Sequence, residues 1–151
     1  MSGLTPEGRP DWSSLRTLIG PADFVEGAID RLLAAATDAE ASDAYWELDN
    51  RVVVQGQLFE AAAAVARELV TRICSTGASM HGLSRALDLL VELAYGEADA
   101  SEVAVGNVGL GAQCRDEIRE GMQCLQARAA HGDDRARTAI RDLVDRLEPP
   151  R

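Results

Sequence analysis

The chain has 151 residues, of which 46% are hydrophobic and 26% are charged, values typical of one globular domain rather than of a disordered or fibrous chain. Its formal charge is -10 at pH 7, so the chain as a whole repels phosphate backbones and anionic lipid surfaces. We therefore expect it to bind neither nucleic acid nor membranes.

The composition also favours helices and a bacterial source. Aromatic residues make up only 4% of the chain and alanine dominates the apolar residues, which is typical of closely packed helices. All 15 basic residues are arginine, which we interpret as the codon bias of a GC-rich bacterial genome. No signal peptide and no apolar stretch of about 20 residues occurs, so we expect a cytoplasmic location.

The first half of the chain predicts a leader and two helices. Residues 1–10 are rich in glycine and proline and predict a flexible leader before one helical domain over residues 11–148. A helix of about 15 residues is expected after Gly20-Pro21. A second helix is expected from Ser42 or Asp43, with the run from Val52 to Val54 as its buried end, because no strand partner is evident.

The second half predicts four more helices and one long loop. The most regular apolar period runs from Gln57 to about Cys74, and a central helix is expected after His81. Residues 96–109 are rich in glycine and acidic, and they predict a flexible loop longer than the usual helix connection. A long helix over residues 110–130 and a last helix between Gly132 and Pro149 complete the domain.

The C-terminal stretch resembles a known repeat family. Three apolar stripes share one spacing, beginning at Ala28, Ala86 and Ala139. Residues 132–139, Gly-Asp-Asp-Arg-Ala-Arg-Thr-Ala, resemble the HEAT-repeat signature, in which an acidic turn and an arginine precede an apolar stripe. The resemblance covers about 18 residues and implies an all-α fold of antiparallel helical hairpins in a short right-handed stack that recognises proteins.

Catalytic, metal and cofactor sites are not expected. The spacing Gly106-x-x-Gly109-x-Gly111 lacks the preceding strand and following lysine of a phosphate site. The cysteines, Cys74, Cys114 and Cys124, have no CxxC spacing and are expected to be reduced thiols. The two histidines, His81 and His131, have no second ligand at metal-binding spacing.

One segment predicts a protein-binding site. In Tyr45-Trp46-x-x-Asp49-Asn50, Tyr45 fits the apolar stripe while Trp46 points away from it, as an interface anchor does. Trp46 could instead pack beneath the leader near Trp12. The excess negative charge lies in residues 1–111. The candidate partner-binding residues are Trp46, Asp49, Asn50, Gln57, Glu60, Glu68, Glu97 and Asp99.

These observations predict a non-catalytic bacterial module that binds another protein with a basic surface, in its sharpest form an immunity or antitoxin protein. The oligomeric state is left open. The alternative is a small helical enzyme or ligand-binding subunit with its cleft at residues 96–109. A pocket lined by perturbed carboxylates, or by Cys74 and His81, would favour that alternative, and a continuous acidic face would favour protein binding.

Overall fold

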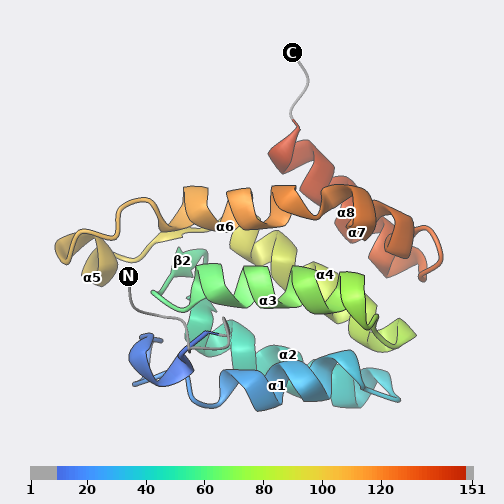
Figure 1. Ribbon diagram of the computed structural model, residues 1–151, viewed down its shortest axis with the longest axis horizontal. Helices are drawn as coiled ribbons and strands as arrows, with labels where there is room; N and C mark the ends of the chain where they lie inside the picture. The colour runs from blue at the N-terminus through green and yellow to red at the C-terminus, as the bar shows by residue number, and fades with distance from the viewer. Residues whose placement is uncertain (1–9, 149–151) are drawn as a thin grey trace.

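The computed structural model describes residues 10–148, and these residues are mainly helical (Figure 1), which confirms the all-α prediction. Apart from Pro10, the predicted leader lies outside the described residues. The first elements are η1 (Trp12–Ser14), α1 (Val25–Leu33), α2 (Asp38–Val52), β1 (Val53–Val54), β2 (Gln57–Leu58) and α3 (Ala62–Ser75). They are followed by α4 (Met80–Tyr95), β3 (Glu97–Ala98), α5 (Ala100–Ala104), α6 (Leu110–Glu120), α7 (Met122–Ala129) and α8 (Asp134–Leu147). Within the described range, no helix combines the length and the apolar character that a membrane span requires.

Side-chain caps fix where four of the helices begin. Thr37, Ser79, Asp99 and Asp133 each accept a hydrogen bond from a backbone N–H in the first turn of the helix that follows. The cap at Thr37 starts α2 at Asp38, earlier than the expected start at Ser42 or Asp43. The cap at Asp133 starts α8 directly after Gly132, as predicted.

A short hairpin replaces the helix end expected at Val54. Val53–Val54 pairs antiparallel with Gln57–Leu58, so β1 and β2 are strands and α3 begins only at Ala62. Gln55 and Gly56 form the turn with φ of 51° and 79°, the left-handed geometry that two-residue hairpins require. β2 also pairs in parallel with β3. No strand partner for β1 was evident in the sequence. The structure supplies β2 directly after the turn and adds β3 from the segment that was expected to be a loop.

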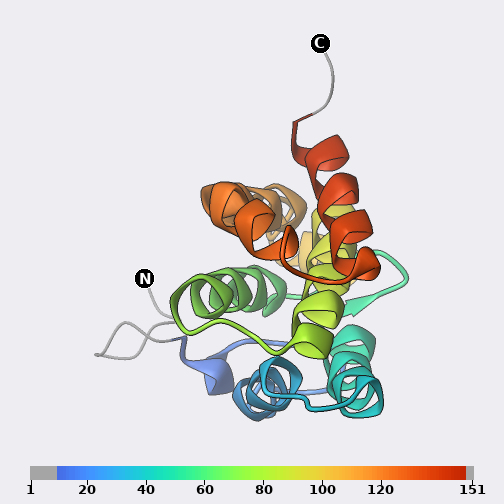
Figure 2. The same ribbon diagram turned by 90° about the vertical axis from the view of Figure 1, so that its right-hand side faces the viewer.

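The core is arranged around α4. Figures 1 and 2 show α1 and α2 on one side, α3 and α4 in the middle, and α6, α7 and α8 on the other side. α4 packs against α1, α2, α3, α6 and α8, while α3 packs chiefly against α6. Leu87, Leu90 and Leu93 of α4 are fully buried, which agrees with its predicted central position. The HEAT-like stacking of the hairpins stays a prediction.

The long helix expected over residues 110–130 is broken at Gly121. This residue ends α6 and caps α7, with a backbone conformation outside the helical region. It lies so close to α3 that a Cβ atom at this position would be 2.2 Å from Cγ1 of Val70. The chain therefore bends at a position where it lies tightly against α3.

Residues 96–109 are held in place by a buried carboxylate rather than forming the expected flexible loop. Glu102 is only 2% exposed. Its oxygens accept hydrogen bonds from the Arg16 guanidinium at 2.7 Å, from the Asn107 side chain at 2.8 Å and from the backbone N–H of Glu60 at 3.2 Å. These bonds fasten α5 to the N-terminal segment and to the residues that follow β2.

Candidate protein-binding face

Tyr45 and Trp46 of α2 point in different directions, as their spacing predicts. Tyr45 is buried, with 7% of its surface exposed, whereas Trp46 is 50% exposed. Successive helical residues are separated by about 100°, which turns one ring into the core and the other toward solvent. The rings still touch edge to face, with centroids 5.0 Å apart. Trp12 is buried in the core, whereas Trp46 is half exposed, and the leader beneath which Trp46 could pack lies outside the described residues.

Two carboxylates and an amide surround the exposed Trp46 ring. Asp43 and Asp49 lie three residues before and after Trp46, and Asn50 lies four residues after it, so all three share its side of the helix. None of these three side chains forms a hydrogen bond or an ion pair within residues 10–148. Their polar atoms therefore have no partner among the described residues, and they can bind another molecule.

A second unpaired carboxylate faces Asp49 from the neighbouring helix. α2 and α4 pack side by side (Figure 2), and burial together with the negative charge of Glu92 raises the pKa of Asp49 to about 6. Within the described part of the chain, Glu92 has no hydrogen bond or ion pair. A cation placed between these two carboxylates would relieve their repulsion. We call the surface formed by these residues the acidic–aromatic face. It consists of Asp43, Trp46, Asp49, Asn50 and Glu92.

An acidic pocket borders the acidic–aromatic face on its α1 side. It has a volume of about 420 Å³ and small alanine side chains in its walls. Glu40, Asp43 and Glu47 line it, together with Arg31, which pairs with Glu47 at 2.5 Å. Asp43 belongs to both the pocket and the face, so the two form one continuous acidic surface along α2.

The other predicted partner-binding acids lie away from this face, and Glu60, Glu97 and Asp99 have intramolecular roles. Glu60 pairs with Arg16 at 3.3 Å, and Glu97 pairs with Arg115 at 3.1 Å and with Arg146 at 3.6 Å. Asp99 caps α5. Gln57 is exposed in β2 opposite Glu97, and Glu68 is partly buried on α3. The structure therefore groups Trp46, Asp49 and Asn50 together, and it gathers Gln57, Glu60, Glu97 and Asp99 near the three short strands.

The expectation of three reduced cysteines is wrong. Cys74 of α3 and Cys124 of α7 form a disulfide, with Cα atoms 6.1 Å apart. Cys114 stays a free thiol, and its burial in α6 raises its pKa to about 12. The two bonded cysteines are 50 residues apart, so no local spacing could have indicated the pair.

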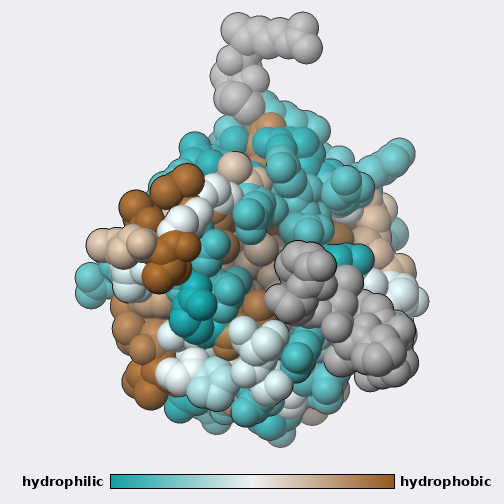
Figure 3. Space-filling view, turned by 60° about the vertical axis from the view of Figure 1, so that its left-hand side comes forward, coloured by the Kyte–Doolittle hydropathy of each residue, from teal (hydrophilic) through white to brown (hydrophobic). Residues whose placement is uncertain are grey.

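An aliphatic surface at the α5 end was not indicated by the sequence analysis. Leu18, Ile19, Val103, Val105 and Val108 are each at least 46% exposed. Figure 3, turned to bring this end of the molecule forward, shows hydrophobic residues in separate groups with hydrophilic residues between them. Nothing in the structure shows what would cover these side chains.

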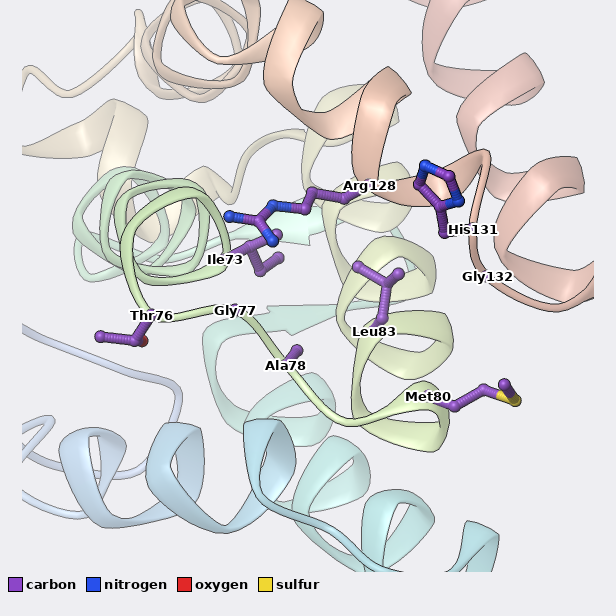
Figure 4. Close-up of a pocket in the computed structure, with 9 residues that line it drawn as sticks. All are labelled: Ile73, Thr76, Gly77, Ala78, Met80, Leu83, Arg128, His131 and Gly132. Carbon is purple, nitrogen blue, oxygen red and sulfur yellow. The ribbon is translucent and has the colours of Figure 1, made fainter.

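A further pocket, of about 410 Å³, lies where α3 ends and α4 begins (Figure 4). Its basic residues, Arg128 and His131, come from the end of α7 and the turn after it. Arg128 reaches across to α3 and donates a hydrogen bond to the carbonyl oxygen of Cys74 at 3.2 Å. Arg128 therefore ties α7 to the C-terminal end of α3.

Comparisons of the chain with protein-family models, with curated proteins and with solved structures find no match. Among residues 10–148, no cluster of three or more His, Cys, Asp or Glu side chains could hold a metal ion. The functional conclusion therefore depends on the chemistry of the surfaces described above.

Proposed function

We propose that this chain is a non-catalytic interaction module whose acidic–aromatic face binds a basic segment of another protein. The observation that carries the proposal is the half-exposed Trp46, which lies between two carboxylates that have no partner among the described residues. Tryptophan is enriched among the residues that dominate binding energy in protein interfaces. It is also the aromatic ring that attracts cations most strongly.

An arginine or lysine side chain of the partner fits this surface best. Its stem can lie on the Trp46 ring while its charged group bonds to Asp43 or Asp49. The adjoining pocket, lined by Glu40, Asp43 and Glu47, offers a second place for a basic side chain. The net charge of -10 favours rapid approach of a basic protein and disfavours acidic ones.

A narrower proposal is that the module is a bacterial immunity or antitoxin protein that covers a basic toxin surface. Its support is the acidic charge, the small helical domain and a basic complement made only of arginine. A cytoplasmic location belongs to the same proposal. The Cys74–Cys124 disulfide is an observation against a purely reducing surrounding, because disulfides persist mainly in oxidising compartments.

The alternative, an enzyme or ligand-binding subunit with a cleft at residues 96–109, has no observation in its favour. The segment forms β3 and α5, and Glu102 fastens it to the domain. None of its residues lines the two pockets described above, the acidic pocket along α2 and the pocket between α3 and α4. Cys74 is oxidised, and the pocket that it lines is not lined by His81.

Differential capture tests the proposal. The immobilised wild-type chain, Trp46→Ala and the control Val108→Ala are exposed at low salt to an extract of cells that express the chain. Val108 is 66% exposed at the α5 end, so its truncation removes a comparably exposed apolar side chain elsewhere. We expect a basic protein to be retained by the wild type and the control and lost by Trp46→Ala. Equal retention by all three chains would contradict the proposal.

A further inference from the structure

The Cys74–Cys124 disulfide lies at an accessible position that the proposed function does not use. Cys74 is in the last turn of α3 and Cys124 is in the first turn of α7, and both residues are partly exposed. Both line an open surface pocket of about 520 Å³. The other side chains of that pocket come from Arg67, Val70, Thr71, Glu117 and Glu120. A small molecule or a partner's side chain can therefore reach the sulfur atoms from solvent.

We propose that Cys74–Cys124 is a redox-active disulfide that exchanges with a dithiol, and that its reduction loosens α7 from α3. Exchange requires a thiolate to reach one sulfur atom of the bond, and the pocket gives it room to do so. The third cysteine cannot take part, because Cys114 is buried and its raised pKa keeps it protonated. Thiol–disulfide exchange is therefore confined to Cys74 and Cys124.

The dithiol is the only reductant that the exchange requires. One thiolate of the dithiol attacks a sulfur atom of the protein disulfide, the S–S bond breaks, and the other cysteine leaves as a thiolate and takes up a proton. The second thiol of the dithiol, as a thiolate, then attacks the sulfur of the dithiol in the mixed disulfide; that S–S bond breaks, and the remaining cysteine leaves as a thiolate and takes up a proton. The protein gains two thiols, and the dithiol is oxidised to a cyclic or linked disulfide.

Charges around the pocket select among reductants. Glu117 and Glu120 line the pocket with two acids, against one arginine, Arg67. Like charges repel an anionic thiol such as glutathione, whereas a neutral dithiol or a basic protein dithiol meets no such barrier. We therefore expect a neutral monothiol such as 2-mercaptoethanol to attack the bond faster than glutathione, also a monothiol, at equal thiolate concentration and low salt.

The effect of reduction should centre on α7, because the disulfide is the covalent link between α7 and α3, which otherwise meet through packing contacts and one side-chain hydrogen bond. α7 has eight residues, and among residues 10–148 the bond from Arg128 to the Cys74 carbonyl oxygen is its one hydrogen bond to α3. Its buried residues, Met122, Leu125 and Ala129, hold it to the rest of the core. Without the disulfide, α7 stays docked through these residues but opens more often than α4.

The test uses the wild-type chain under native conditions. Dithiothreitol is added at increasing concentrations, thiols are alkylated after a quench, and the modified cysteines are counted by mass spectrometry. We expect a reduction rate proportional to dithiothreitol, with Cys114 unmodified, and reoxidation when oxidised dithiothreitol is supplied. A rate that saturates at the rate of global unfolding would overturn the proposal, because the bond would then react only in unfolded chains.

Hydrogen exchange tests the structural half of the proposal. In the reduced chain, the amides of α7 should exchange at least tenfold faster, while those of residues 86–93 in α4 should keep their protection. Cys74→Ser/Cys124→Ser should show the same pattern without any reductant. If α7 is equally protected in the oxidised and reduced wild type, reduction does not loosen it and that half of the proposal is wrong.

Discussion

At the residue scale, Tyr45 and Trp46 divide the aromatic surface of α2 between core and solvent. Tyr45 is 7% exposed, so Tyr45→Ala leaves a cavity, and we expect it to lower the free energy of unfolding by about 3–5 kcal/mol. Trp46→Ala removes a half-exposed ring and its edge-to-face contact with Tyr45, which is worth about 1 kcal/mol, so we expect a smaller loss of stability. Urea denaturation of both variants measures the difference. Equal losses of stability would show that Trp46 is a structural residue.

The carboxylate of Asp49, which has no ion-pair partner among residues 10–148, predicts a pH dependence of stability that also arises from one residue. The pKa of Asp49 is raised from 3.8 to about 6. Between these two pH values, the carboxyl group is protonated in the folded chain and ionised in the unfolded chain. The charge therefore destabilises the fold above pH 6 and has no such effect below pH 4. We expect Asp49→Asn to raise the free energy of unfolding by about 1–2 kcal/mol at pH 8 and to have little effect at pH 4.

Binding of a basic partner should offset the destabilisation that the charged Asp49 causes. A cation beside Asp49 and Glu92 favours the charged carboxylates, so binding should release a proton near pH 6 and weaken as the pH falls to 5. Calorimetry in buffers of different ionisation enthalpy measures the proton release. Binding without proton release at pH 6 would place the partner away from Asp49.

At the scale of elements, two glycines in equivalent helix positions predict opposite effects. Gly82 is the third residue of α4, and a Cβ atom there would lie 2.3 Å from the carbonyl oxygen of Leu32 in α1. Gly27 is the third residue of α1, and its Cβ would meet only the flexible Arg31 side chain at 3.4 Å. We expect Gly82→Ala to destabilise the fold by at least about 2 kcal/mol. Gly27→Ala should stabilise it by up to about 1 kcal/mol.

Thermal unfolding of the two variants checks the packing of α4 on α1. The wild type is the common reference, since both substitutions add one methyl group to the first turn of a helix. Gly82→Ala as stable as Gly27→Ala would mean that α4 does not approach the backbone of α1 this closely.

The packing of each helix or strand explains whether the sequence could predict it. The apolar stripes of α3, α4 and α8 have the helical period, because each of these helices buries one face against the core. The two-residue strands have no period to detect, and β2 depends on β3, about 40 residues away. The spacing Asp99-x-x-Glu102 resembles a helix-capping pattern and could have indicated α5.

The candidate site, too, could be predicted from the sequence only in part. The outward direction of Trp46 follows from helical spacing, so the sequence predicted it together with Asp49 and Asn50. Glu92 lies on a different helix, and only the packing of α2 against α4 brings it to Asp49. Glu60, Glu97 and Asp99 were chosen for their charge, and the structure provides each with an intramolecular partner that charge alone could not reveal.

At the scale of the whole molecule, the charge distribution and the acidic–aromatic face lead to the same expectation. The excess negative charge lies in residues 1–111, which include α2 and α4, while residues 112–151 are balanced. Long-range attraction should speed the approach of a basic partner, and added salt should weaken it. Trp46 should determine how long the complex lasts, because buried aromatic anchors act mainly on dissociation.

The most direct measurement is a calorimetric titration of the captured partner into the wild-type chain and into Trp46→Ala, each at low and at high salt. We predict that Trp46→Ala binds at least about 30-fold more weakly, the equivalent of about 2 kcal/mol. We also predict that the wild-type affinity falls with added salt while Trp46→Ala keeps its fold. An affinity that is unchanged by Trp46→Ala, or indifferent to salt, would contradict binding through the acidic–aromatic face.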